Sequence, residues 1–319
     1  MYDYLKKGDI YIPEFQRSYV WNRIQASRLI ESLIIQCPIS VLYLNQDRDE
    51  KLSVIDGNQR LQSIKLYLSD EYPLRGLTTY PELEGFYFSE LDPRISRHIL
   101  NRTLRCVAVL KDTHPQIKFD VFERLNTGAV QVNPHELRHG IFHGDLIETL
   151  DELSKEPVWK DVSGIKNDKR MKGAELILRF IALREDLKQY KRPLSGFLNN
   201  FCEKNQNPGK QKLLSWKTSF LQTIKNVNIL LGDFAFRIFD EKRKINKNIS
   251  AALYDAQMIG ISNIPGKLPK ISQGSLKRKL MALYQEEEFR QSITSGTSTS
   301  RSVRYRISRF KDFLNSLES

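Results

Sequence analysis

The spacing of apolar residues changes character partway along the chain. Up to about residue 145, short apolar runs typical of buried strands alternate with stretches whose apolar residues recur every three or four positions, which indicates amphipathic helices. The predicted strands are 10–13, 41–44, 52–55 and 104–110, and the predicted helices are 24–36, 59–68 and 116–125. The pattern therefore predicts an α+β fold, with an α/β domain over 1–145 followed by a mostly helical half over 146–319.

A run of helices is expected from Asn133-Pro134 onward, because Asn caps a helix N-terminus and Pro fits the first turn. Further helices are predicted over 169–184, 194–203, 213–231, 250–261, 275–283 and 302–317.

The charge of the chain is distributed unevenly. Residues 1–160 hold 20 Lys and Arg against 23 Asp and Glu, whereas residues 161–319 hold 30 against 15. A positive field of this kind attracts phosphate backbones, so DNA is the partner predicted for the second half. The alternative is that these Lys and Arg side chains only cover the solvent-exposed polar faces of helices. The candidate contacts are Lys242, Arg243, Lys244, Lys247, Lys277, Arg278, Lys279, Arg301, Arg304, Arg306, Arg309 and Lys311.

Composition excludes several classes of protein. No run approaches the ~18 consecutive apolar residues of a membrane span, and no signal segment is visible at the start. The three cysteines, Cys37, Cys106 and Cys202, are not in metal-ligand spacing, which favours reduced thiols. We therefore expect a cytoplasmic protein that makes no membrane contact.

The most informative local pattern runs from Ser53 to Arg60, where a buried strand meets a turn and then a helix. A helix N-terminus presents unpaired N–H groups that suit a phosphate, and Gly57 lets a ligand approach the backbone. Arg60 could fork onto phosphate oxygens, while Asp56 could hold a metal or orient a water. The alternative is a plain Asp-Gly turn in which Asp56 caps the helix and Arg60 pairs with a surface acid.

Two further segments are candidates for a ligand pocket. Residues 12–21 are dense in aromatic side chains that could stack on a base, with Gln16 and Arg17 as directed donors. Residues 122–128 end a helix and present Arg124 and Asn126 in a polar loop. Each segment also has a purely structural interpretation, the first as a lid with core aromatics and the second as a helix closed by a glycine.

Together the segments resemble a known family. The order I-P-x-F-Q-R-x-Y-V-W, then D-G-x-Q-R-L, then V-F-x-R-L-N-T-G, then E-L-R is similar to the N-terminal domain family of the GmrSD-type modification-dependent restriction endonucleases. The similarity spans roughly residues 11–144. The resemblance implies a ParB/sulfiredoxin-like fold, a site that binds and often hydrolyses a nucleoside triphosphate, and a role in defence against foreign DNA.

The resemblance also assigns residues. The family's D-G-Q-Q-R turn falls on residues 56–60, with Asn58 in place of the first Gln, a shorter amide that bears on hydrolysis more than on binding. It implies catalytic roles for Asp56, Gln59 and Arg60. It implies nucleotide-binding roles for Gln16, Arg17, Gly57, Asn58, Arg60, Arg124 and Asn126. The nucleotide is ATP, GTP or CTP, with Mg²⁺ as an accompanying ion, and no residue is assigned as a dedicated metal ligand.

Histidine content limits the chemistry of the second half. The five histidines all lie at or before His143, and a His-Asn-His-type nuclease needs a histidine base. The second half is therefore not such a nuclease, and cutting would fall to a separate nuclease or helicase partner. His135 and His139 fit the H-E-x-x-H zinc pattern, but Pro134 puts His135 in the first helical turn, and the metzincin continuation is missing.

These observations favour an NTP-binding, NTP-hydrolysing sensor or regulatory subunit of a DNA-targeting restriction system, with self-association open. One alternative is a non-catalytic protein that keeps the fold and binds only DNA or a partner. The other is a metal-dependent nuclease that uses Asp56 and neighbouring acids.

Overall fold

The computed structural model describes residues 1–13, 19–47, 49–125, 133–168, 170–239, 244–264 and 268–317. The chain divides into two compact units, 1–132 and 133–319, which we call the N-terminal and C-terminal units. Sequence patterning placed the change at 145. The structure assigns α6 (Pro134–Ile141) to the C-terminal unit because this helix packs against α9 (Lys172–Asp186) and α10 (Leu194–Lys204).

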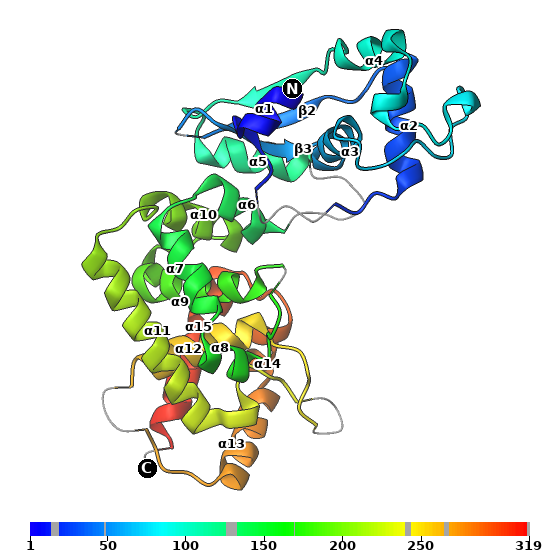
Figure 1. Ribbon diagram of the computed structural model, residues 1–319. Coiled ribbons are helices and arrows are strands. Elements are labelled where there is room, and N and C mark those ends of the chain that lie inside the picture. Colours follow the sequence, from blue (N-terminus) through cyan, green and yellow to red (C-terminus); the bar gives the residue numbers. More distant parts are fainter. Residues whose placement is uncertain are drawn as a thin grey trace. The chain divides into compact units, whose positions relative to one another are not determined.

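The N-terminal unit is built on a four-stranded mixed sheet (Figure 1). Its strands are β1 (Ile10–Tyr11), β2 (Leu42–Gln46), β3 (Leu52–Asp56) and β4 (Cys106–Val109), in the order β1-β3-β2-β4. β1 is parallel to β3 and β4 is parallel to β2, whereas β2 and β3 are antiparallel. The α+β class predicted from the sequence is confirmed.

Five helices accompany the sheet. They are α1 (Tyr2–Lys7), α2 (Arg23–Ile34), α3 (Asn58–Leu68), α4 (Pro93–Leu100) and α5 (Pro115–Leu125). Two single 3₁₀ turns, η1 (Pro81–Leu83) and η2 (Phe88–Glu90), lie between α3 and α4. α2 packs against both α3 and α4, and the apolar faces of these helices bury one core cluster. A second cluster is buried by β1, β2, β3 and Leu61 of α3, so the start of α3 is fixed against the sheet.

A buried carboxylate fixes the loop that follows α3. Glu31, on α2, accepts hydrogen bonds from the backbone N–H groups of Thr78, Thr79 and Tyr80 at 2.9, 2.6 and 3.1 Å. Burial by itself raises the pKa of Glu31, but the three N–H donors outweigh it, and the net effect lowers that pKa.

The C-terminal unit is helical (Figure 1). Its other helices are α7 (Asp145–Ser154), α8 (Pro157–Ser163), α11 (Lys210–Leu231), α12 (Ala251–Ser262), α13 (Gln273–Gln285), α14 (Glu287–Thr294) and α15 (Ser300–Asn315), with 3₁₀ turns η3 (Leu187–Gln189) and η4 (Gly232–Phe234). α12 is buried along almost its whole length and packs against α9, α11 and α15. An apolar helix without a polar face needs neighbours on all sides, which explains why it lies at the centre.

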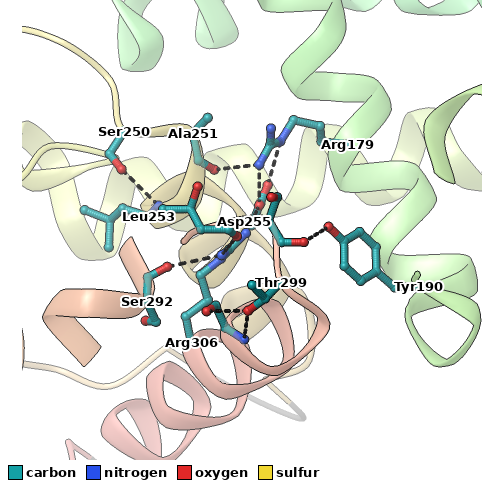
Figure 2. A network of polar contacts seen from close by, with 12 residues as sticks. Arg179, Tyr190, Ser250, Ala251, Leu253, Asp255, Ser292, Thr299 and Arg306 are labelled. Carbon is teal, nitrogen blue, oxygen red and sulfur yellow. Dashed lines mark hydrogen bonds and ion pairs between the residues drawn. The ribbon is translucent and has the colours of Figure 1, made fainter. Parts of the chain in front are cut away.

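One buried acid links three helices of this unit. The carboxylate of Asp255, on α12, accepts hydrogen bonds from Nε and Nη2 of Arg179 on α9 at 3.0 and 2.6 Å (Figure 2). It also accepts one from Nη2 of Arg306 on α15 at 2.6 Å. Arg306 also donates through Nη1 to the carbonyls of Ser292 and Thr297. The interpretation of Arg306 as a DNA contact is wrong, because its side chain is 1% exposed and holds the helices together.

We expect Glu31→Gln to lower the free energy of unfolding at neutral pH by about 1–3 kcal/mol, because buried N–H donors lose a charged acceptor. A lowered folded-state pKa adds stability that is complete above the unfolded value of about 4.3 and is lost as the pH falls through the folded value. Urea denaturation between pH 2.5 and 7 should therefore show a smaller acid-induced loss in the variant than in the wild type. Glu82→Gln, at an exposed site, is the control. Equal pH dependence of Glu31→Gln and the wild type would contradict the assignment.

We expect Asp255→Asn to destabilise the C-terminal unit by about 3–5 kcal/mol, because two buried guanidinium groups lose their charged partner. The matched control is Glu286→Gln, which breaks the partly exposed pair with Arg309 and should cost no more than about 1 kcal/mol. Guanidinium chloride denaturation followed by circular dichroism measures both. Similar midpoints for the two variants would show that Asp255 does not organise the unit.

Candidate functional site

The candidate site is the corner where β3 passes into α3. Gly57 forms this turn with φ of 102°, a left-handed conformation that favours glycine. A Cβ at this position would lie 2.2 Å from Cδ2 of Leu42 on β2, so a side chain does not fit either. The Asp-Gly turn predicted from the sequence is therefore required by both backbone conformation and packing.

Arg60 connects this corner to the segment that enters β2. Its Nη2 lies 2.8 Å from Oδ2 of Asp56 and donates to the carbonyl of Val41 at 3.3 Å. Its Nη1 donates to Oγ of Ser40 at 2.6 Å and also to the Ser40 carbonyl. The Arg60 side chain is 12% exposed, and its guanidinium is directed at these protein oxygens.

Asp56 is held in place by that contact while its side chain stays 49% exposed. The sequence left open whether Asp56 caps α3, but the helix has no side-chain cap, and its N-cap residue is Gly57. The N-terminus of an 11-residue helix without a side-chain cap lies beside a half-exposed carboxylate. Backbone N–H groups at such a terminus can receive an anion.

Gln59 joins the corner to the first sequence motif. Its Oε1 accepts hydrogen bonds from the backbone N–H groups of Val20 and Trp21 at 2.8 and 3.2 Å. One turn further along α3, Oγ of Ser63 lies 2.9 Å from the hydroxyl of Tyr19. Sequence reasoning gave Gln59 a catalytic role and missed Ser63. The contacts show that both hold residues 19–21 against α3.

The structure describes only some of the remaining predicted site residues. Gln16, Arg17 and Asn126 lie outside the described residues. Arg124 is exposed in the last turn of α5, and Asn58 accepts a hydrogen bond from Nε2 of Gln62 at 2.7 Å within α3. The structure thus brings together Asp56, Gly57, Asn58, Gln59 and Arg60, and the pocket proposed around the other four residues stays a prediction.

A second polar cluster, which sequence reasoning missed, lies at the start of β3. The hydroxyl of Tyr11 donates to Oδ2 of Asp47 at 2.6 Å, and Oδ1 of Asp47 accepts from Nδ2 of Asn45 at 2.7 Å and from Oγ of Ser53 at 3.3 Å. Burial raises the pKa of Asp47. The cluster joins β1, β2 and β3, so it aligns the strands that lead to the corner.

The zinc pattern of α6 is structural. Glu136 completes a capping box with Asn133, and Nε2 of His139 lies 2.8 Å from Oδ2 of Asp151. His135 is fully buried, and burial holds its pKa well below the ordinary value. Within the described part of the chain, no group of three His, Cys, Asp or Glu side chains could hold a metal ion.

Comparison with protein families decides the relationship of the N-terminal unit. Residues 1–143 match the family described as GmrSD restriction endonuclease, N-terminal domain. This segment is a GmrSD-type N-terminal domain. The domain includes the corner at Gly57 and extends through α6, and the resemblance inferred from the D-G-x-Q-R turn and its flanking motifs is confirmed. A search of curated proteins finds no match to the chain. Among the described residues, no helix is long and apolar enough to cross a membrane.

We expect Gly57→Ala to destabilise the GmrSD-type domain by more than the ~1–2 kcal/mol cost of a left-handed alanine, because the new Cβ also overlaps Leu42. Gly85→Ala is the matched control, since Gly85 has a φ of 87° but open space around the added Cβ. Thermal denaturation of both variants separates the two costs. Equal loss of stability would mean that the packing against Leu42 is unimportant.

Proposed function

We propose that this chain is the NTP-binding, NTP-hydrolysing sensor or regulatory subunit of a DNA-targeting restriction system, with the nucleotide phosphates at the corner formed by residues 56–60. The observation that carries the proposal is the α3 N-terminus without a side-chain cap, beside the half-exposed Asp56, in a GmrSD-type N-terminal domain. The family is that of a restriction endonuclease's N-terminal domain, which supports the link to defence against foreign DNA.

The corner offers complementary groups for a triphosphate. Backbone N–H groups in the first turn of α3 attract phosphate oxygens, and the helix dipole adds to that attraction. The exposed part of Asp56 suits a hard cation, and Mg²⁺ would neutralise triphosphate charge there. Arg60 acts as a positioning residue, because its contacts with Asp56 and Ser40 fix the carboxylate against the sheet.

Gln59 gives the corner a connection to a neighbouring segment. Through Val20 and Trp21 it holds the end of the motif that contains Gln16 and Arg17. A ligand at the start of α3 would act on the same helical turn that holds this segment. We propose that nucleotide occupancy is communicated along this route to a separate nuclease or helicase partner.

DNA contact by the C-terminal unit is part of the proposal, but fewer cations are available than the sequence indicated. Arg309 pairs with Glu286 and Arg301 pairs with Glu288, whereas Arg278 and Lys311 are exposed. Exposed cations of this kind contribute to sequence-independent binding of phosphate backbones.

A non-catalytic interaction protein is the second candidate. The observation that favours it is the engagement of the Arg60 guanidinium by Asp56, Ser40 and Val41, because a phosphate would have to compete with these oxygens. Intact DNA binding without phosphate release would support this function. A metal-dependent nuclease that uses Asp56 and neighbouring acids is the remaining alternative. A magnesium-dependent plasmid nicking assay tests it.

We expect the wild-type chain to bind at least one of ATP, GTP and CTP at sub-millimolar concentration with Mg²⁺, measured with labelled nucleotides. Asp56→Asn should weaken binding roughly tenfold, since loss of one charged contact is worth about 1.4 kcal/mol or more. The control is Asp49→Asn, an exposed acid in the same unit whose pair with Lys51 is also exposed. Absence of binding by the wild type, or equal effects of the two variants, would overturn the proposal.

A further inference from the structure

A basic groove lies beside α4 in the N-terminal unit, away from the residues of the corner. The groove encloses about 550 Å³ and is lined by seven residues, among which there is no acidic side chain and no Phe, Tyr or Trp. Its cationic groups are Arg94, Arg97 and Arg102. None of these residues belongs to the nucleotide site or to the basic helical half predicted from the sequence.

The sequence of α4 explains why the basic side chains gather on one face. Ile95 and Ile99 are four residues apart and face the core that α4 shares with α2. Arg94 directly precedes Ile95 and Arg97 lies between the two isoleucines, and both arginine side chains are exposed. Asp92 caps the helix by accepting from the N–H of Arg94 at 2.8 Å, so its carboxylate faces the backbone.

Arg102 forms a fixed part of the groove. Its Nη2 donates to the carbonyls of Gln36 and Cys37 at 2.7 and 3.0 Å, which ties the end of α2 to the residues after α4. Its buried Nε has no hydrogen-bond partner among the described residues. The groove is therefore bounded by an immobilised guanidinium with an unsatisfied donor.

The arginines of this groove differ from three arginines of α15 in one respect. On α15, Arg301, Arg306 and Arg309 each pair with a carboxylate. Within the described part of the chain, neither Arg94 nor Arg97 lies within 4.0 Å of a carboxylate oxygen. Uncompensated positive charge in a groove concentrates anions, whereas paired charge does not.

We propose that the α4 groove is a binding surface for the phosphate backbone of duplex DNA. The row from Arg94 to Asn101 extends about 10 Å along the helix, which exceeds the reach of one phosphate group. The lining lacks Phe, Tyr and Trp, the large rings on which unstacked bases usually pack, so a row of cations here suits a continuous phosphate backbone better than a free nucleotide or an unstacked single strand. The inference goes beyond the proposed function, which places DNA on the C-terminal unit, and it holds whether or not a nucleotide binds at the corner.

The test uses the full chain with the double variant Arg94→Gln/Arg97→Gln. Binding of a fluorescent 20-base-pair duplex is measured by anisotropy at several salt concentrations. We expect the affinity at low salt to fall tenfold or more, and the slope of log K against log salt to decrease by about 2, since each phosphate contact contributes about 0.9. The matched control is Lys6→Gln/Lys7→Gln, which removes two exposed charges from α1 of the same unit.

Unchanged affinity and slope in the Arg94→Gln/Arg97→Gln variant would overturn the proposal, as would absence of duplex binding by the wild type. An equal loss in the α1 control would show a general charge effect and would also overturn it. Tighter binding of duplex RNA than of DNA would refute the assignment to DNA. A thermal melt of each variant verifies folding. Nucleotide titration of the Arg94→Gln/Arg97→Gln variant shows whether binding at residues 56–60 is intact, so a loss of DNA binding can be told apart from a failure of the proposed nucleotide site.

Discussion

The candidate site depends on the close approach of β2 to the turn between β3 and α3. Gly57 leaves no room for a Cβ against Leu42, and this packing brings the Ser40 carbonyl and hydroxyl within reach of Arg60. Arg60 in turn holds Asp56 at the end of β3. Without the Arg60–Asp56 ion pair, the position of the Asp56 carboxylate relative to the first turn of α3 would not be fixed. The corner could then not present both groups to one ligand.

Charge alone does not indicate which surface meets nucleic acid. The C-terminal unit contains most of the positive excess, yet several arginines on α15 are neutralised by acids of α12, the α13–α14 junction and α14. The α4 groove belongs to a unit without a positive excess, but its arginines have no carboxylate partner among the described residues. The balance of each cation with its own neighbours is therefore more informative than regional net charge.

The sequence predicted the elements whose apolar spacing is regular. The strands around β2 and β3 were recognised from their short apolar runs, and the helix after Gly57 from apolar residues that recur three or four positions apart. α4 was missed, since Ile95 and Ile99 are its main inward residues and eight residues give a weak period. The structural role of Arg306 was missed as well, although its spacing from Val303 and Phe310 places it on the buried face of α15.

Pairing partners were less predictable than elements. The Asp56–Arg60 ion pair has a spacing of four residues, but the sequence analysis left open only a pair between Arg60 and an unspecified surface acid, with Asp56 as the helix cap. The hydrogen bonds from Val20 and Trp21 to Gln59 join residues 39 and 38 positions apart, which no local pattern encodes. Tertiary packing alone determines such contacts, and the family resemblance indicated only that the segments belong together.

Hydrogen–deuterium exchange of the backbone amides of residues 57–61, with and without Mg²⁺ and each nucleoside triphosphate, tests the central claim most directly. If phosphates bind the start of α3, exchange at these amides slows when the correct nucleotide is added. Slower exchange elsewhere, with residues 57–61 unchanged at saturating nucleotide, would contradict the account.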